Sequence, residues 1–331
     1  MALGAVAQGE TLRIATYNTE LQRDGPGLFL RDLARGDDDQ INAVLDVIAA
    51  ADADVLALQG MDYDLTGEAL RLFATSAGYP HFFALRPNTG MATGLDMDGD
   101  GRLGGPRDAQ GYGRFSGQGG MAILSRFAVD VANVQDLSAL RWVDTPNAHL
   151  PEVAGQPFPS DTALSAQRLS TTGHWIVPVI GPNGPFQVLT FHASPPVFDG
   201  PEDRNGKRNH DEIRLWEHVL AGAVGQKPDG PFVIAGDANL DPIDGEGIKE
   251  AIVSLLGSPQ VQDVAPSGHS GTDTVDWDDP TPGDLRVDYV LPSTHWQVVG
   301  SGVLWPAPDD PFAPTVALAS RHRLVWMDLS Y

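Results

Sequence analysis

Short apolar segments that alternate with amphipathic segments along the whole chain limit most strongly how this sequence can fold. Apolar runs at 12–17 and 54–59 have the length and composition of buried strands. Between them, apolar residues recur at helical spacing and predict a helix over 40–52. Strands that alternate with helices over the full length predict an α/β fold built from layered sheets.

The rest of the chain continues this pattern without a break. No linker or repeat divides it, so we expect one domain over 11–331. Two segments, 87–119 and 193–209, lack periodicity, and loops this long in a compact domain are usually functional or disordered. We expect further strands near 81–86, 120–125, 175–180, 186–192, 231–236, 286–291, 296–304 and 323–329, and further helices near 66–77, 210–223 and 246–256.

The N-terminal segment 1–10 carries an Ala-x-Ala pattern at Ala5 and Ala7. This pattern is typical of the end of a secretory signal peptide, here without a positively charged start and most of the apolar region. We therefore expect a secreted or periplasmic protein. An ordinary flexible N-terminus is the alternative.

The charge balance limits the partners of the protein. Acidic residues number 44 and basic residues 21, which gives a formal net charge of −23. A surface this acidic repels nucleic-acid backbones, so we expect no broad basic nucleic-acid-binding face, and a phosphate substrate requires a local bridge such as a divalent cation. The chain contains no cysteine, which excludes thiolate ligands, and no apolar run of membrane-spanning length. We expect a monomer.

The strongest local signal is the segment 232–239, an apolar strand that ends in Gly-Asp-Ala-Asn. Residues two apart in an extended chain point the same way, so Asp237 and Asn239 project together from the edge of a sheet. Folds of the α/β class bind ligands at such edges. A turn in which the two side chains bind only the local backbone is the alternative.

Other polar side chains lie at strand ends in the same way. Asn18 ends the first strand, His192 ends the strand at 186–192, and His322 directly precedes the last strand. Asp288 lies inside an apolar strand, where an unpaired carboxylate would be costly. Each residue alone also fits a structural role, such as a cap or a hydrogen-bonded core histidine. Their joint occurrence favours a site.

Six motifs connect these residues in a fixed order. They are Thr-Tyr-Asn at 16–18, Leu-Ala-Leu-Gln at 56–59, Gly-Met-Ala-Ile-Leu-Ser-Arg at 120–126, Gly-Asp-Ala-Asn at 236–239, Arg-Val-Asp-Tyr at 286–289 and Ser-Arg-His at 320–322. Together they resemble the endonuclease/exonuclease/phosphatase superfamily, the metal-dependent phosphoesterases similar to deoxyribonuclease I. The resemblance implies a four-layer sandwich, in which two packed mixed β-sheets are flanked by helices and the site lies at one edge.

The resemblance also implies roles for the residues at the strand ends. Asn18 and Asp237 would help to bind a catalytic Mg²⁺ or Mn²⁺, with Ca²⁺ as an alternative, and Asp288 would orient His322 for proton transfer. Carboxylate and amide oxygens suit such hard cations, and a carboxylate-oriented imidazole suits acid–base work near neutral pH. The catalytic residues implied in this way are His192, Asp237, Asn239, Asp288 and His322.

The chain departs from the family pattern at two positions. The family places a metal-binding glutamate after Leu-Gln, whereas this chain has Gly60. Asp62 lies two residues further, on the same face if the strand continues, and we expect it to take over as a ligand. A weaker metal site, or an inactive descendant of the family, is the alternative. Arg321 stands where the family has an aspartate before the histidine, and it adds a cation near the phosphate site.

The first aperiodic segment contains spaced carboxylates typical of a calcium-binding loop. Asp96, Asp98 and Asp100 are followed by glycine, which matches the first half of such a loop. Its twelfth position is Arg107, and Asp108 is the next carboxylate that can close an altered loop. We expect a structural Ca²⁺ here, with a solvated acidic turn as the alternative.

The second aperiodic segment contains the densest basic cluster of the chain, within 198–211. It follows His192, so we expect it at the same edge of the sheet, where arginine can grip a phosphate group. Helix capping and ion pairs with neighbouring acids are the alternative. The predicted phosphate-binding residues are Arg204, Arg208, Asn209, His210 and Arg321.

Two function classes follow from these observations. The first is a divalent-metal-dependent hydrolase of phosphoester bonds, acting on a phosphorylated small molecule or on nucleic acid. The second is a Ca²⁺-stabilised binding protein that keeps the fold and has little or no turnover, which the glycine at 60 favours. The complete set of polar residues at the strand ends favours the enzyme.

Overall fold

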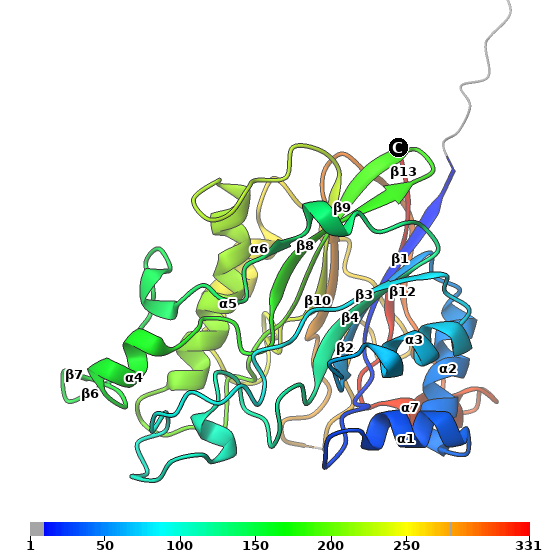
Figure 1. Cartoon of the computed structure of the whole chain (residues 1–331). Helices are drawn as coiled ribbons and strands as arrows, with labels where there is room; N and C mark the ends of the chain where they lie inside the picture. The colour runs from blue at the N-terminus through cyan, green and yellow to red at the C-terminus, as the bar shows by residue number, and fades with distance from the viewer. Residues whose placement is uncertain (1–9, 279) are drawn as a thin grey trace, which may run out of the picture.

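A computed structural model of the protein describes residues 10–278 and 280–331 (Figure 1). The predicted signal-peptide remnant therefore lies outside the described residues, apart from Glu10. The helices are α1 (Leu28–Arg35), α2 (Asp39–Ala51), α3 (Glu68–Ser76), α4 (Asp161–Ala166), α5 (Arg204–Leu220), α6 (Glu250–Leu256) and α7 (Ala313–Ala319).

The strands confirm the expected α/β pattern, and most of them form two mixed sheets. The first sheet has the order β12-β13-β1-β2-β4-β3 and the second the order β11-β10-β9-β8-β5. β1 pairs with β2, and β9 with β10, in parallel; the other pairs in the two sheets are antiparallel. The strands are β1 (Leu12–Asn18), β2 (Val55–Met61), β3 (His81–Phe83), β4 (Gly120–Ser125), β5 (Gln135–Asp136), β6 (Glu152–Val153), β7 (Gln156–Pro157), β8 (His174–Gly181), β9 (Gly184–His192), β10 (Phe232–Asp237), β11 (Asp288–Pro292), β12 (Gln297–Val303) and β13 (Val325–Ser330).

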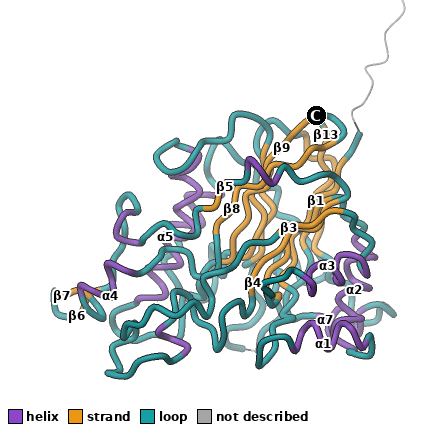
Figure 2. The backbone as a smooth tube through the Cα atoms, viewed as in Figure 1, coloured by secondary structure: helices purple, strands orange, loops and turns teal. Residues whose placement is uncertain are grey.

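The two sheets pack face to face with helices outside, which confirms the four-layer sandwich. Ile14 of the first sheet and Val188 and Val233 of the second belong to the core between the sheets. The outer face of the first sheet is covered by α1, α2, α3 and α7, and that of the second by α5 and α6 (Figures 1 and 2). Within the described residues, none of the helices combines the length and apolar character that crossing a bilayer requires.

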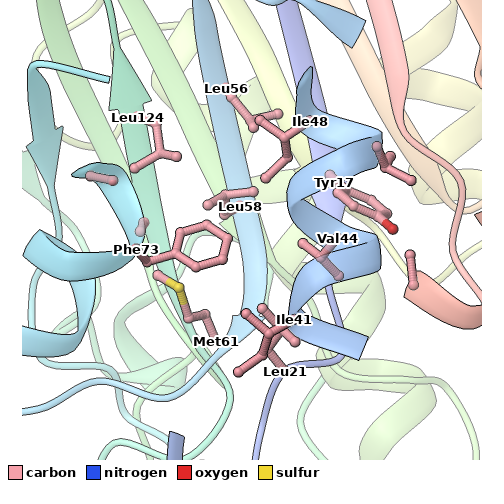
Figure 3. Close-up of a cluster of buried hydrophobic side chains, with 14 of the residues drawn as sticks. Tyr17, Leu21, Ile41, Val44, Ile48, Leu56, Leu58, Met61, Phe73 and Leu124 are labelled. Atoms are coloured by element: carbon pink, nitrogen blue, oxygen red, sulfur yellow. The ribbon is translucent and has the colours of Figure 1, made fainter. Parts of the chain in front are cut away.

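Helix α2 shows how local sequence produces one of these layers. Its side chains at helical spacing, Ile41, Val44 and Ile48, are buried against Leu56 and Leu58 of β2 (Figure 3). At its start, a carboxylate oxygen of Asp38 accepts a hydrogen bond from the backbone N–H of Ile41 at 2.8 Å. This cap satisfies a donor that the helix leaves without a partner, so the predicted helix over 40–52 is confirmed.

The prediction of a loop over 193–209 is wrong from Arg204 onward, because α5 begins there and not near 210. Gly206 lies inside the helix, where glycine costs about 1 kcal/mol relative to alanine. Arg204 and Arg208, one turn apart, donate to backbone carbonyls of neighbouring loops, including those of Met97 and Leu169. These long-range bonds hold the first turns in a helical conformation that the local sequence does not indicate.

The helices α1, α4 and α7 were not predicted. They have eight, six and seven residues, too few for a helical period to be recognised in a window of about 11–18 residues.

Candidate active site

Four of the predicted site residues lie at strand ends along one edge of the two sheets. Asn18 is the last residue of β1, and His192 and Asp237 are the last residues of the parallel strands β9 and β10. In the second sheet, Asp237 lies opposite His192 on one side and opposite Asp288 on the other. The strand register alone therefore places two carboxylates and an imidazole side by side.

A hydrogen bond joins the two sheets at this edge. The amide nitrogen Nδ2 of Asn18 donates to Asp237 Oδ2 at 2.9 Å and lies 3.4 Å from His322 Nε2. The other carboxylate oxygen of Asp237 accepts from the backbone N–H of Asn239 at 2.8 Å. The Asn239 side chain donates to the carbonyl of Ala193 at 3.0 Å, so it connects the chain ends that leave β9 and β10.

His322 is held by Asp288 in the arrangement expected of an acid–base pair. Its Nδ1 lies 2.8 Å from Asp288 Oδ2, and the hydroxyl of Thr274 donates to the same oxygen at 3.0 Å. Burial opposes charge on the imidazole, but the charge and hydrogen bond of Asp288, with contributions from Asp237 and Glu20, raise the pKa of His322 to about 9. His322 is therefore an imidazolium at neutral pH.

The second histidine is held in the opposite state. Burial lowers the pKa of His192, although Asp237 Oδ2 lies 3.4 Å from its Nε2 and partly counteracts the shift. Burial and the nearby charge of Asp288 raise the pKa of Asp237, while His322, His192 and Asn18 partly oppose this. One imidazole that holds its proton and one that lacks it thus flank the same carboxylate, as acid–base chemistry requires.

The oxygen atoms around Asp237 fit a hard divalent cation. Ligand atoms of Asp237, Asp288 and His322 lie within 4.8 Å of one another. Asp288 Oδ1 is buried and has no hydrogen-bond partner among the described residues. Asn18 Oδ1 accepts one long hydrogen bond, of 3.3 Å, from the backbone N–H of Glu20. Carboxylate and amide oxygens with free lone pairs are the ligands that Mg²⁺ and Mn²⁺ prefer.

Gly60 occupies a point where this backbone leaves no room for a side chain. Its φ is +72°, and the register of β2 against β4 shifts between Gln59 and Met61. A Cβ at this position would overlap Asn18 Oδ1 and lie 2.9 Å from the backbone nitrogen of Glu20. The glutamate that the family resemblance implies after Leu-Gln therefore does not fit here without a shift of the chain that follows Asn18.

The structure does not bring Asp62 to the carboxylates at the strand ends. Its two oxygens accept hydrogen bonds from the backbone N–H groups of Arg23 and Gly119, each at 2.9 Å. Asp62 thus connects two loops at the rim, and its replacement of the family glutamate stays a prediction.

The carboxylate that does lie in the cleft beside Asn18 belongs to Glu20. It accepts from the backbone N–H of Arg321 at 2.8 Å and forms an ion pair with the Arg321 guanidinium. Burial would raise the pKa of Glu20, but the hydrogen bonds of Arg321 and the charge of His322 outweigh this and lower it. The side chain of Arg321 is 63% exposed and lines the cleft, so it remains accessible to an anionic ligand.

A cleft of about 1440 Å³ opens over the site. Asn18, His192, Asn239 and His322 line it. The ring of Trp277, also in its wall, meets His322 edge to face with centroids 6.0 Å apart. The cleft exceeds the roughly 300–1,000 Å³ of common small-molecule pockets, so it has room for more than a single phosphate group.

The predicted phosphate-binding arginines of α5 line this cleft, but neutral oxygens already bind their N–H groups. Arg204 donates to the carbonyl of Met97 and the amide oxygen of Gln167. Arg208 donates to the carbonyls of Gln110, Arg168, Leu169 and Ser170, and burial lowers its pKa to about 10. The two side chains hold loops against α5, and their service as a phosphate clamp stays a prediction.

The next two residues of α5 lie away from the phosphate position we expected. Asn209 is fully buried, and its amide donates to the carbonyls of Ser194 and Ala238 at 2.7 Å each. His210 is not part of the cleft wall, because its ring packs against His149 and Asp211. The sequence analysis placed Asn209 in the loop and His210 at the start of the helix, whereas both lie inside α5 and are turned into the protein.

The predicted calcium loop assembles three of its four proposed ligands. Carboxylate oxygens of Asp96, Asp98 and Asp108 lie within 4.8 Å of one another, and Asp100 is not part of this group. The oxygens of Asp108 also accept backbone hydrogen bonds from Met97 and Gly105 at 2.9 Å each. Asp108 therefore does close the loop, and the bound Ca²⁺ stays a prediction.

Three residues of the site were missed at the sequence level. They are Glu20, Thr274 and Trp277. Glu20 follows Asn18 by two residues at a strand end, which is the same signal that pointed to Asn239. No local signal marks Thr274 or Trp277, since both reach the site from a long loop.

The fold and this arrangement of polar residues define a class: layered α/β proteins in which buried carboxylates and a histidine meet at one edge of two packed sheets. The chain belongs to the endonuclease/exonuclease/phosphatase family, whose profile matches residues 15–322. Members of this family are metal-dependent phosphoester hydrolases. Among curated proteins, none matches the chain.

Solved structures with the same fold are distant in sequence. An endonuclease/exonuclease/phosphatase from Beutenbergia cavernae is 21% identical, with 97% of this chain and 71% of that chain covered and a TM-score of 0.58. Sphingomyelinase C from Streptomyces griseocarneus is 18% identical (96% and 99% covered, TM-score 0.53). A beta toxin variant from Staphylococcus aureus with bound magnesium ions is 12% identical (96% and 99% covered, TM-score 0.53). At these identities the likeness shows the fold.

Proposed function

We propose that this protein hydrolyses phosphodiester bonds with the help of a bound Mg²⁺ or Mn²⁺ ion. The observation that carries the proposal is the Asp288–His322 pair, with its 2.8 Å contact: His322 lies in the wall of a large cleft, and Asp288 and Asp237 are buried directly behind it. The family membership and the magnesium-bound relative support a metal-dependent phosphoesterase. A structural role alone would not require an imidazolium between two buried carboxylates.

The oxygens of Asn18, Asp237 and Asp288 would hold the metal ion, with Glu20 adjacent. Such an ion neutralises charge on phosphate oxygens and stabilises the charge that develops during displacement. Asp237 is fixed by Asn18 and Asn239, so it would orient a water molecule beside it, and its raised pKa would let it accept a proton from that water. His322 keeps a proton that it can donate to the phosphate or the leaving oxygen, and Asp288 stabilises the imidazolium.

The charge of the protein favours small or mobile phosphoesters over long nucleic acids. A net charge of −23 repels a polyanion beyond the reach of a bound metal. Nucleotides, sugar phosphates and lipid headgroups would each place a single phosphoester in the cleft, and among them the phospholipid headgroup is a diester. The accessible guanidinium of Arg321 gives such a phosphate a second cation. Nucleic acid bridged by the metal is the competing substrate class.

Hydrolysis of bis(p-nitrophenyl) phosphate by chelator-stripped protein tests the proposal. We expect release of p-nitrophenol when Mg²⁺ or Mn²⁺ is added back, and its loss in the His322→Ala variant. His269→Ala, a histidine on an exposed loop outside the cleft, is the matched control and should keep full activity.

Two results would contradict the proposal. One is metal-dependent release at an unchanged rate in His322→Ala. The other is no release with any metal, which would favour a catalytically weak binding protein and give the glycine at position 60 as its cause.

A further inference from the structure

A second group of histidines and a carboxylate lies outside the cleft. His149 belongs to the loop after Trp142, and His210 and Asp211 belong to α5. One ligand atom from each of the three residues lies within 4.8 Å of the other two. Neither the proposed hydrolysis nor the cleft uses these side chains.

The three atoms form a nearly equilateral triangle. His149 Nδ1 lies 2.9 Å from His210 Nδ1 and 3.1 Å from Asp211 Oδ1, and His210 Nδ1 lies 2.8 Å from the same oxygen. A tetrahedral metal with ligand bonds of about 2.0–2.1 Å separates its ligands by about 3.3 Å. Movements of a few tenths of an ångström would convert the triangle into one face of such a site.

Hydrogen bonds alone cannot satisfy all three contacts between these atoms. If each imidazole directs an N–H at Asp211 Oδ1, the two donors face each other at 2.9 Å. If one ring lacks that hydrogen, its lone pair faces the carboxylate oxygen instead. A cation at the centre removes the conflict, because both nitrogens and the oxygen then act as lone-pair donors to it.

The carboxylate of Asp211 is already oriented toward this point. Its other oxygen, Oδ2, accepts from the indole N–H of Trp142 at 2.6 Å and from the backbone N–H of His149 at 2.7 Å. These bonds leave Oδ1 directed at the two histidines. Fixation of a ligating carboxylate by hydrogen bonds to its second oxygen is a regular feature of protein metal sites.

The burial of the three residues gives an ion access from one side. Asp211 is 2% exposed and His210 7% exposed, whereas the His149 side chain is 51% exposed. An entering ion thus meets a fixed pair of ligands and one ligand at the surface. Three protein ligands leave a fourth position for water.

We propose that His149, His210 and Asp211 form a second metal site, which takes a transition-metal ion of the Zn²⁺ class and ties the loop around 149 to α5. Two imidazoles and one carboxylate suit Zn²⁺, whereas Ca²⁺ and Mg²⁺ prefer sets of oxygen ligands. The site is separate from the catalytic residues at the strand ends. The inference does not depend on the proposed hydrolysis.

Zn²⁺ titration of chelator-stripped protein, with Mg²⁺ and Ca²⁺ in excess to occupy oxygen sites, tests this proposal. We expect one equivalent of Zn²⁺ to bind, and Co²⁺ in its place to give the strong visible absorption of a four-coordinate ion. In His149→Ala the affinity for Zn²⁺ should fall by more than about tenfold. Loss of a hydrogen-bond partner of a metal ligand already lowers metal affinity by about 10–100-fold, and loss of the ligand itself should cost more. Because His149 is half exposed, this variant should fold.

His218→Ala is the matched control, because it removes another histidine of α5 that is not among the three ligands. It should bind Zn²⁺ as the unaltered protein does, and Zn²⁺ should raise the Tm of both but not of His149→Ala. Equal Zn²⁺ affinity in His149→Ala and the unaltered protein would overturn the proposal. Hydrolysis of the phosphodiester by His149→Ala should be unchanged, so this site and the catalytic site are tested separately.

Discussion

The two groups of histidine and carboxylate in this protein are built in opposite ways. Asp237 and Asp288 lie opposite each other in paired strands, and His322 is buried against them. His149 comes from an exposed loop that folds against α5, where it meets His210 and Asp211. Strand register therefore fixes the first group, and packing of a loop on a helix fixes the second.

This difference also separates their chemistry. At the strand ends, the carboxylates outnumber the charged imidazole, so His322 gains a proton and can transfer it. Around Asp211, two imidazoles share one carboxylate oxygen, which favours a metal ion over a proton. We therefore propose that the same residue types serve proton transfer in one place and metal binding in the other.

Removal of the negative charge of Asp288 should have the largest effect. We expect Asp288→Asn to lower turnover by about 10²–10⁴-fold, because His322 loses both its orientation and the charge that raises its pKa. The activity of the unaltered protein should fall as pH rises through about 9, where His322 loses its proton, and in Asp288→Asn this fall should begin at lower pH. A pH–rate profile with bis(p-nitrophenyl) phosphate measures both effects.

The control for this experiment is Asp161→Asn, an exposed carboxylate at the start of α4. Its profile should match that of the unaltered protein. If the activity of Asp288→Asn falls at the same alkaline pH as that of the unaltered protein, His322 does not carry the essential proton.

The charge on His322 should also appear in the stability of the protein without metal. Its folded pKa of about 9 lies above the unfolded value near 6.5, so the contribution is complete below about pH 6.5 and disappears as pH rises toward 9. The difference amounts to on the order of 3 kcal/mol. Urea unfolding with chelator present should therefore show the unaltered protein losing stability relative to His322→Gln between about pH 6.5 and pH 9. A difference that does not vary with pH would contradict the raised pKa.

Glu20 and Asp62 offer two answers to the glycine at position 60, and one experiment compares them. Glu20 lies in the cleft beside Asn18, so we expect Glu20→Gln to raise the Mg²⁺ concentration for half-maximal activity about tenfold. Asp62→Asn should raise it less and should lower the Tm, since Asp62 connects two loops. A larger metal effect for Asp62→Asn would identify Asp62 as the replacement ligand.

The contrast between strand-fixed and loop-fixed groups also explains how far the sequence could be interpreted. Asn18 and Asp237 were predictable because strand ends have a fixed side-chain direction. Asp288 was expected inside a strand and lies at the first residue of β11. The layered α/β class followed from the strands, whereas the four-layer sandwich followed from the family resemblance. Residues 204–209 were expected in a loop because the start of α5 depends on arginine contacts to distant carbonyls. Glu20 has the same two-residue spacing after a strand end as Asn239, so it could have been predicted, whereas its backbone φ of 48° could not.

The loop that contains Asp96, Asp98 and Asp108 carries the smallest expected effect, and it extends the comparison to a group fixed by a loop alone. If Ca²⁺ binds there, the ion should raise the Tm by about 1–2 °C for each kcal/mol of binding energy linked to folding. Asp98→Asn should abolish this shift. Asp100→Asn is the matched variant, because Asp100 lies outside the group of converging oxygens and should keep the shift. Thermal unfolding of both variants and the unaltered protein, with and without Ca²⁺, measures the shift in Tm. Loss of the shift in both variants would identify Asp100 as a ligand as well. If Ca²⁺ does not change the Tm of the unaltered protein, the three carboxylates form a solvated acidic turn.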